Sequence, residues 1–272
     1  MSNKTIKIIF FGDLVGKPGR FAVRDFLSEH KEKYDFVIAN VENASHGFGL
    51  TEKNYNELSE YGINCMTSGN HIWDKREIFN YIDNASKLLR PVNYPAGTKG
   101  LGSKVFDLGE YKVGVLNVLG KVFINAVDFQ WEMIKSEIQK LKEITPIVII
   151  DFHAEATAEK ICFGKLCSEL GVSAFFGTHT HVQTADEEVI NGMGYITDAG
   201  FCGASDGVIG MEYQTSLGRF LTGIPERYEV AEGKEVQLNA VEVGIDIITG
   251  KAFSIKRILC RRNKDKEGKD EN

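Results

Sequence analysis

The chain has 272 residues, of which 43% are hydrophobic and 26% charged, as is usual for a globular protein of one large or two small domains. Its net charge of −6 argues against broad nucleic-acid binding through a basic surface, although metal ions could still hold a nucleotide. The five cysteines form no C-x-x-C pair, so we expect reduced thiols in a cytoplasmic protein. We expect neither a signal peptide nor a membrane span, because no apolar run is long enough.

Apolar runs and amphipathic segments alternate along the first two thirds of the chain. In chain order, the predicted elements are strand 6–11, helix 19–34, strand 36–41, helix 51–61, strand 65–66, strands 105–106 and 111–118, helix 128–142, strand 147–150, helix 158–170, strand 172–176 and strand 194–197. Alternation of this kind predicts an α/β layered fold.

The C-terminal part has a different pattern. Residues 236–248 and 253–260 read as two strands of a β-hairpin, joined by a turn that contains Gly250. We therefore expect a mixed sheet, or two packed sheets, with antiparallel strands outside a partly parallel centre. We expect a single domain over residues 1–262 and a charged, disordered tail over residues 263–272.

Side chains that can bind metals follow five of the predicted strands. They are Asp13, Glu42, Asn43, Asn70, His71, His153, His179 and His181. Ligands of open α/β sheets bind outside the carboxyl ends of the strands, so these side chains should converge on one edge. The most informative stretch is Gly-Thr-His-Thr-His at residues 177–181, because histidine is the commonest metal-binding side chain.

Carboxylate, amide and imidazole ligands together suit manganese, iron or zinc, and a bridging carboxylate allows two ions. Such a pair can hold a bridging hydroxide for in-line attack on phosphorus, and a histidine outside the ligand set could protonate the leaving oxygen. Simpler roles remain open at single positions. Asp13 could cap a helix, Asn43 and Asn70 could be turn residues, and His153 could be a buried core histidine.

The order of these motifs resembles the calcineurin-like metallophosphoesterases, whose usual pattern is D-x-H, G-D, G-N-H-D/E, H and G-H-x-H. Two departures are informative, since Val15 replaces the usual histidine and Glu42 replaces the bridging aspartate. F-G-D-L-V-G at residues 11–16, E-N-A at 42–44 and T-D-A-G at 197–200 are similar to the YmdB-like branch of that superfamily. The resemblance extends from residue 6 to about residue 200.

The resemblance implies a sandwich of two mixed β-sheets flanked by helices, which gives four layers. It also implies a phosphodiesterase that hydrolyses 2′,3′- or 3′,5′-cyclic nucleotides at a di-iron or manganese centre, with zinc as another possible metal. Carried over by motif, the ligands of metal 1 are Asp13, Asn43 and His181, those of metal 2 are Asn70, His153 and His179, and the bridge is Glu42. Asn43 would fill the place that Val15 leaves vacant, and His71 would be the general acid.

Several alternatives stay open at this stage. The same metals could serve a phosphomonoesterase or nucleotidase, and the fold could serve a non-catalytic nucleotide-binding regulator. His71 could position the phosphate instead of donating a proton. The glycine-rich residues 201–207 could form a wall of the pocket or a subunit contact in a homo-oligomer. Substrate-binding residues are not identifiable from the sequence, but we expect a small-molecule phosphoester as the partner.

Overall fold

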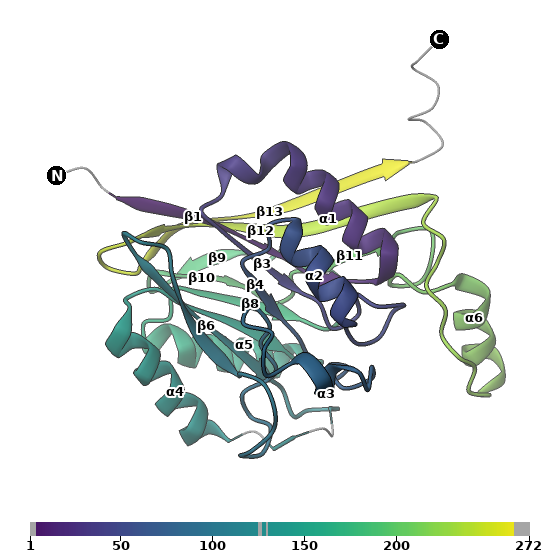
Figure 1. Ribbon diagram of the computed structural model, residues 1–272, viewed down its shortest axis with the longest axis horizontal. Helices are drawn as coiled ribbons and strands as arrows, with labels where there is room; N and C mark the ends of the chain where they lie inside the picture. Colours follow the sequence, from purple (N-terminus) through teal and green to yellow (C-terminus); the bar gives the residue numbers. More distant parts are fainter. Residues whose placement is uncertain (1–3, 125–126, 129, 264–272) are drawn as a thin grey trace, which may run out of the picture.

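The computed structural model describes residues 4–124, 127–128 and 130–263. Within them the chain forms two stacked sheets with helices on both outer faces (Figure 1). The first sheet has seven strands, which are β1 Thr5–Phe11, β2 Asp13–Leu14, β3 Phe36–Asn40, β4 Cys65–Thr67, β11 Phe201–Ala204, β12 Glu235–Asp246 and β13 Ala252–Asn263. Their order is β2-β11-β12-β1-β3-β4, and β13 pairs with β12.

The second sheet has six strands in the described part of the chain. They are β5 Ser103–Asp107, β6 Lys112–Leu119, β7 Val148–His153, β8 Ala174–Thr178, β9 Glu188–Ile190 and β10 Met193–Ile196. Its central strands β6, β7, β8 and β10 are parallel, whereas β5 and β9 are antiparallel edges. Both sheets are therefore mixed, as expected from the sequence.

The alternation of side chains along the strands builds the layers. In β1, Ile8 and Phe10 point between the sheets, where the Phe10 ring stacks on Phe176 of the other sheet at 4.5 Å. Ile9 and Phe11 point the opposite way and pack under the helices of the first sheet. Because successive strand residues face opposite sides, a continuously apolar strand such as β1 can serve two cores at once.

Helices cover the outer faces of both sheets. Their bounds are α1 Gly16–His30, the 3₁₀ turn Lys31–Lys33, α2 Glu52–Glu60, α3 Ile78–Tyr81, α4 Trp131–Ile144, α5 Thr157–Glu169 and α6 Tyr213–Thr222. Helices α1 and α2 contribute to the core outside the first sheet, and α4 and α5 to the core outside the second. Helix α6 stands apart at the right of Figure 1, beyond the ends of the strands.

The strands and helices predicted from the sequence are present, with shifts of a few residues at their ends. Five elements were missed, namely β2, β9, β11, α3 and α6. Strand β13 includes Asn263, the first residue of the predicted tail, and residues 264–272 lie outside the described part. The division into one domain and a tail stays a prediction. No helix in the described residues is long and apolar enough to cross a membrane.

Candidate metal centre

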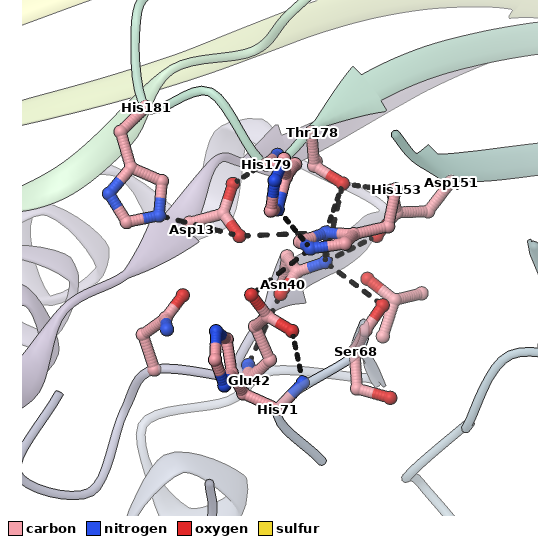
Figure 2. A network of polar contacts seen from close by, with 12 residues as sticks. Asp13, Asn40, Glu42, Ser68, His71, Asp151, His153, Thr178, His179 and His181 are labelled. Carbon is pink, nitrogen blue, oxygen red and sulfur yellow. Dashed lines mark hydrogen bonds and ion pairs between the residues drawn. The ribbon is translucent and has the colours of Figure 1, made fainter. Parts of the chain in front are cut away.

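The predicted site residues meet where strands of both sheets end (Figure 2). Asp13 begins the short strand β2, two residues after the end of β1, and Glu42 lies two residues after β3. From the second sheet, His153 is the last residue of β7, and His179 directly follows β8. The parallel strands β1, β3, β7 and β8 thus deliver carboxylates from one sheet and imidazoles from the other, as the general rule for α/β sheets predicts.

Three of these groups face one point. Atoms of Glu42, His153 and His179 that could bind a metal all lie within 4.8 Å of one another. His153 Nε2 is 3.0 Å from Glu42 Oε1 and 3.0 Å from His179 Nδ1. The ring nitrogens of His153 and His179 face each other beside the Glu42 carboxylate. One proton cannot form hydrogen bonds with all three groups, whereas a metal cation could bind all three, so the arrangement suits a cation.

Side-chain oxygens that lack a hydrogen-bond partner indicate whether the remaining predicted ligands fit a metal. Among the described residues, Asp13 Oδ1, Asn43 Oδ1 and Asn70 Oδ1 are buried side-chain atoms with no hydrogen-bond partner. Leaving a polar atom buried and unpaired costs free energy, so such atoms normally have a reason. A metal ion would supply the missing partner, and the donor set of carboxylates, amides and imidazoles matches iron, manganese or zinc.

Hydrogen bonds hold the side chains of Asn43 and Asp13 so that one oxygen of each remains without a hydrogen-bond partner. The Asn43 side-chain NH₂ donates to the carbonyl of Gly47 at 2.9 Å, which leaves its Oδ1 unbonded. Asp13 Oδ2 accepts a hydrogen bond from the His179 backbone N–H at 3.1 Å, while its Oδ1 lies 3.9 Å from His181 Nε2. A role for Asp13 as a helix cap is excluded, because Val15 is the N-cap of α1.

A buried chain of hydrogen bonds orients His153. Its Nδ1 lies 2.9 Å from the Thr178 hydroxyl, which donates to Asp151 Oδ1 at 2.7 Å. The Asn40 NH₂ donates to the other oxygen of Asp151 at 2.9 Å, and its Oδ1 accepts from the Glu42 backbone N–H at 3.2 Å. Partners of this kind fix which ring nitrogen a histidine offers to a metal, which here is Nε2.

The other two histidines are oriented in the same way. Glu155 Oε2 lies 3.1 Å from His179 Nε2, so that Nδ1 faces the centre. The carbonyl of Ile209 lies 3.0 Å from His181 Nδ1, so that Nε2 faces Asp13. Ile209 has a φ of 47°, which is strained for a β-branched residue and is found where a functional arrangement requires it.

The loop that carries His179 and His181 also has unusual backbone geometry. Both residues have positive φ, 102° and 62°. Between them, Thr180 donates through its N–H and its hydroxyl to Asp198 Oδ2, at 3.1 and 2.7 Å. The same carboxylate accepts from Lys160 Nζ at 2.6 Å, and both side chains of this ion pair are only 1% exposed.

In the centre, burial and the neighbouring charges shift the pKa values of Glu42 and His153 in opposite directions. Burial disfavours a charged Glu42, but His153 and the His71 N–H overcome this and lower the pKa of Glu42 to about 2. Burial likewise opposes protonation of His153, yet Glu42 and Asp13 raise its pKa to about 9. Burial and the neighbouring His153 lower the pKa of His179 to about 3. Burial raises the pKa of Asp13, so Glu42 is the carboxylate held in its charged form, and its negative charge attracts a cation.

His71 lies beside the ligand cluster and not within it. Its backbone N–H donates to Glu42 Oε2 at 3.0 Å, its Nδ1 lies 3.0 Å from Asp74 Oδ2, and its ring contacts Phe48 at 4.8 Å between centroids. The side chain is 32% exposed and lines a cavity of about 360 Å³ over the centre. This position suits a group that acts on a substrate.

The sequence analysis missed the supporting residues. Asn40, Asp151, Thr178 and Glu155 each lie next to a predicted ligand in sequence or at the same strand end, which was the signal available. The glycine-rich residues 201–207 include β11, in which Phe201 stacks on the His181 ring at 5.5 Å.

The four layers and the site at the strand ends define a calcineurin-like metallophosphoesterase fold. The calcineurin-like phosphoesterase YfkN from Bacillus subtilis shares this fold with a TM-score of 0.54 at 14% identity, covering 94% of this chain and 90% of that one. A sequence model of the YmdB-like protein family matches residues 9–258, and the chain belongs to that family. Both resemblances predicted from the motifs are confirmed.

Two relatives are much more similar. A 2′,3′-cyclic-nucleotide 2′-phosphodiesterase from Bacillus subtilis (strain 168) is 44% identical over 257 residues, which cover 93% of this chain and 97% of the relative. The crystal structure of a phosphatase from Mycoplasma pneumoniae superposes with a TM-score of 0.88 at 36% identity, covering 96% of this chain and 95% of that one. The fold and the cluster of Glu42, His153 and His179 together support use of divalent metal.

Proposed function

We propose that the protein is a binuclear-metal phosphodiesterase that hydrolyses cyclic nucleotides. The observation that carries the proposal is the cluster of Glu42, His153 and His179, which occurs together with unpartnered buried oxygens on three further predicted ligands. A binding module would not need such a set of unpaired groups at one point. The 44% identity to a 2′,3′-cyclic-nucleotide 2′-phosphodiesterase supports the same substrate class.

We propose two ions, with Glu42 as the residue they share. Asp13, Asn43 and His181 would hold one ion, since Asp13 and Asn43 each have a buried oxygen without a partner and the Nε2 of His181 faces Asp13. Asn70, His153 and His179 would complete the second. Iron or manganese suits the mixed oxygen and nitrogen donors best, and zinc is the alternative.

When bound, ions of this kind add positive charge to phosphate oxygens and lower the pKa of water at the site. The protein's own contribution to the reaction is a proton donor. Asp74 occupies the Nδ1 of His71, so Nε2 is the nitrogen that remains for a substrate. The bond from the His71 N–H to Glu42 keeps the donor close to the ligands. We therefore propose that His71 protonates the leaving alkoxide.

We also propose the cytoplasm as the location of the enzyme, because all five cysteines are unpaired. We propose a small-molecule phosphoester as its partner and leave a homo-oligomer as a prediction.

A panel of substrates tests the function. The protein would be reconstituted with iron or manganese and assayed on 2′,3′- and 3′,5′-cyclic nucleotides, bis-p-nitrophenyl phosphate and p-nitrophenyl phosphate. We expect the diesters to be hydrolysed faster than the monoester, with a cyclic nucleotide as the best natural substrate. A strong preference for the monoester would identify a phosphomonoesterase, and no turnover by the fully metallated protein would identify a regulator.

A further inference from the structure

The cavity over the metal centre is lined by two chemically different groups of residues. Glu42, His179 and His181 belong to the centre, whereas the group that we call the apolar end consists of aromatic and aliphatic side chains that include Phe48, Tyr228 and Phe220. A site that binds one ligand through a charged group and an apolar group commonly has this division. The nature of the apolar end therefore bears on the substrate.

Aromatic rings lead from His71 into the apolar end. The Phe48 ring lies 4.8 Å from the ring of His71 and 6.2 Å from the ring of Tyr228. The Arg219 guanidinium lies 4.2 Å from the centre of the Tyr228 ring and holds that ring from one side. The row therefore begins at the proposed acid and continues away from the metals.

Phe220 adds a ring from helix α6. It lines the cavity although its side chain is 81% exposed, and such exposure of a phenylalanine carries no benefit for the fold. The helix that carries it is firmly terminated, because Glu212 accepts hydrogen bonds from two backbone N–H groups at its start and Gly223 ends it in the left-handed conformation. The ring is thus held at the cavity with an open face.

We infer that Phe48, Tyr228 and Phe220 form a platform on which the base of the substrate nucleotide stacks. The inference rests on the proposed function, which places the phosphate at the other end of the cavity. A nucleobase is a flat group with two π-faces, and aromatic side chains bind such groups through stacking. Stacking tolerates all bases, so the platform favours nucleotides over base-free phosphodiesters without selecting one base.

The test compares two substrates that each contain a five-membered cyclic phosphate ring, one with a base and one without. One is adenosine 2′,3′-cyclic phosphate and the other is glycerol 1,2-cyclic phosphate, which has no base. The variants are Phe220→Ala and Tyr228→Leu, and the matched control is Leu221→Ala. Leu221 is next to Phe220 and similarly exposed, at 75%, but does not line the cavity.

We expect Phe220→Ala to reduce the ratio of kcat/KM for the nucleotide over that for the glycerol substrate by about 5- to 150-fold, mainly through KM, because base stacking contributes about 1–3 kcal/mol per base. Tyr228→Leu should change the ratio in the same direction, and Leu221→Ala should not change it. Equal losses on both substrates, or an unchanged ratio in both platform variants, would overturn the platform while leaving the phosphodiesterase intact. Failure of the wild-type protein to hydrolyse either substrate would instead overturn the proposed function.

Discussion

The buried ion pair between Lys160 and Asp198 can be tested by replacing Lys160 with methionine. The substitution keeps most of the volume of the side chain but leaves Asp198 buried without its cation. Breaking a buried pair in this way costs about 3–5 kcal/mol. For a chain of this length, at about 2 °C per kcal/mol, the Tm of the metal-free protein should fall by about 6–10 °C.

The same substitution should weaken metal binding. Asp198 holds the Thr180 backbone between His179 and His181, the two proposed histidine ligands, so a displaced carboxylate would shift both. Loss of an outer partner of metal ligands typically reduces metal affinity by about 10- to 100-fold. The measurements are thermal unfolding after chelation and metal titration by calorimetry, with Lys165→Met, at an exposed position of the same helix, as the control.

The two readouts separate the possible outcomes. A lower Tm with wild-type metal affinity would show that the pair only stabilises the fold, and the positioning argument would then be wrong. A wild-type Tm would show that Asp198 is adequately neutralised by its three other hydrogen bonds, from Thr180 N, Thr180 Oγ1 and Gly200 N.

Three further predictions concern the centre itself. Glu42→Gln should lose metal and turnover together while the far-ultraviolet circular dichroism stays native, because the amide brings no charge to the ions; near-normal turnover at full metal content would exclude Glu42 as the bridge. His71→Ala should slow hydrolysis of a cyclic nucleotide by about 10²–10⁴-fold. The same variant should affect bis-p-nitrophenyl phosphate much less, since its leaving group needs no proton, and equal losses on both substrates would favour a phosphate-positioning role. Metal at about 100 times its Kd should stabilise the fold by about 2.7 kcal/mol, so chelation should lower Tm by about 5 °C, whereas an unchanged Tm would argue against specific binding.

The meeting of the candidate ligands could be predicted because they follow recognisable apolar strands. Asp13, Glu42, His153 and His179 stand at the point where β-prone sequence stops, and parallel strands end at a common edge. The strand–helix alternation predicted an α/β layered fold, whereas the four layers were implied by the family resemblance. Local sequence is sufficient here because both the strand and the position of its end are local properties.

The remaining features depend on contacts between distant residues. Lys160 lies on α5 and would be expected in solvent, yet it is fully buried against Asp198, 38 residues away. Helix α6 was missed although Tyr213, Leu217, Phe220 and Leu221 recur at helical spacing and Gly223 marks its end. Strand β11 was missed because it has four residues and contains a glycine. The aromatic platform combines residues from three separate segments.

The position of β12 has a consequence for the biosynthesis of the enzyme. This strand lies between β1 and β11, pairing Phe11 with Ala240 and Gly203 with Gln237. Strand β11 in turn pairs with β2, which holds Asp13. Strand β1 therefore waits for the much later strand β12 before this part of the sheet can form, and such distant pairing makes folding slow. A nascent chain that stops before residue 235 lacks β12 and leaves edges of β1 and β11 unpaired, which favours aggregation.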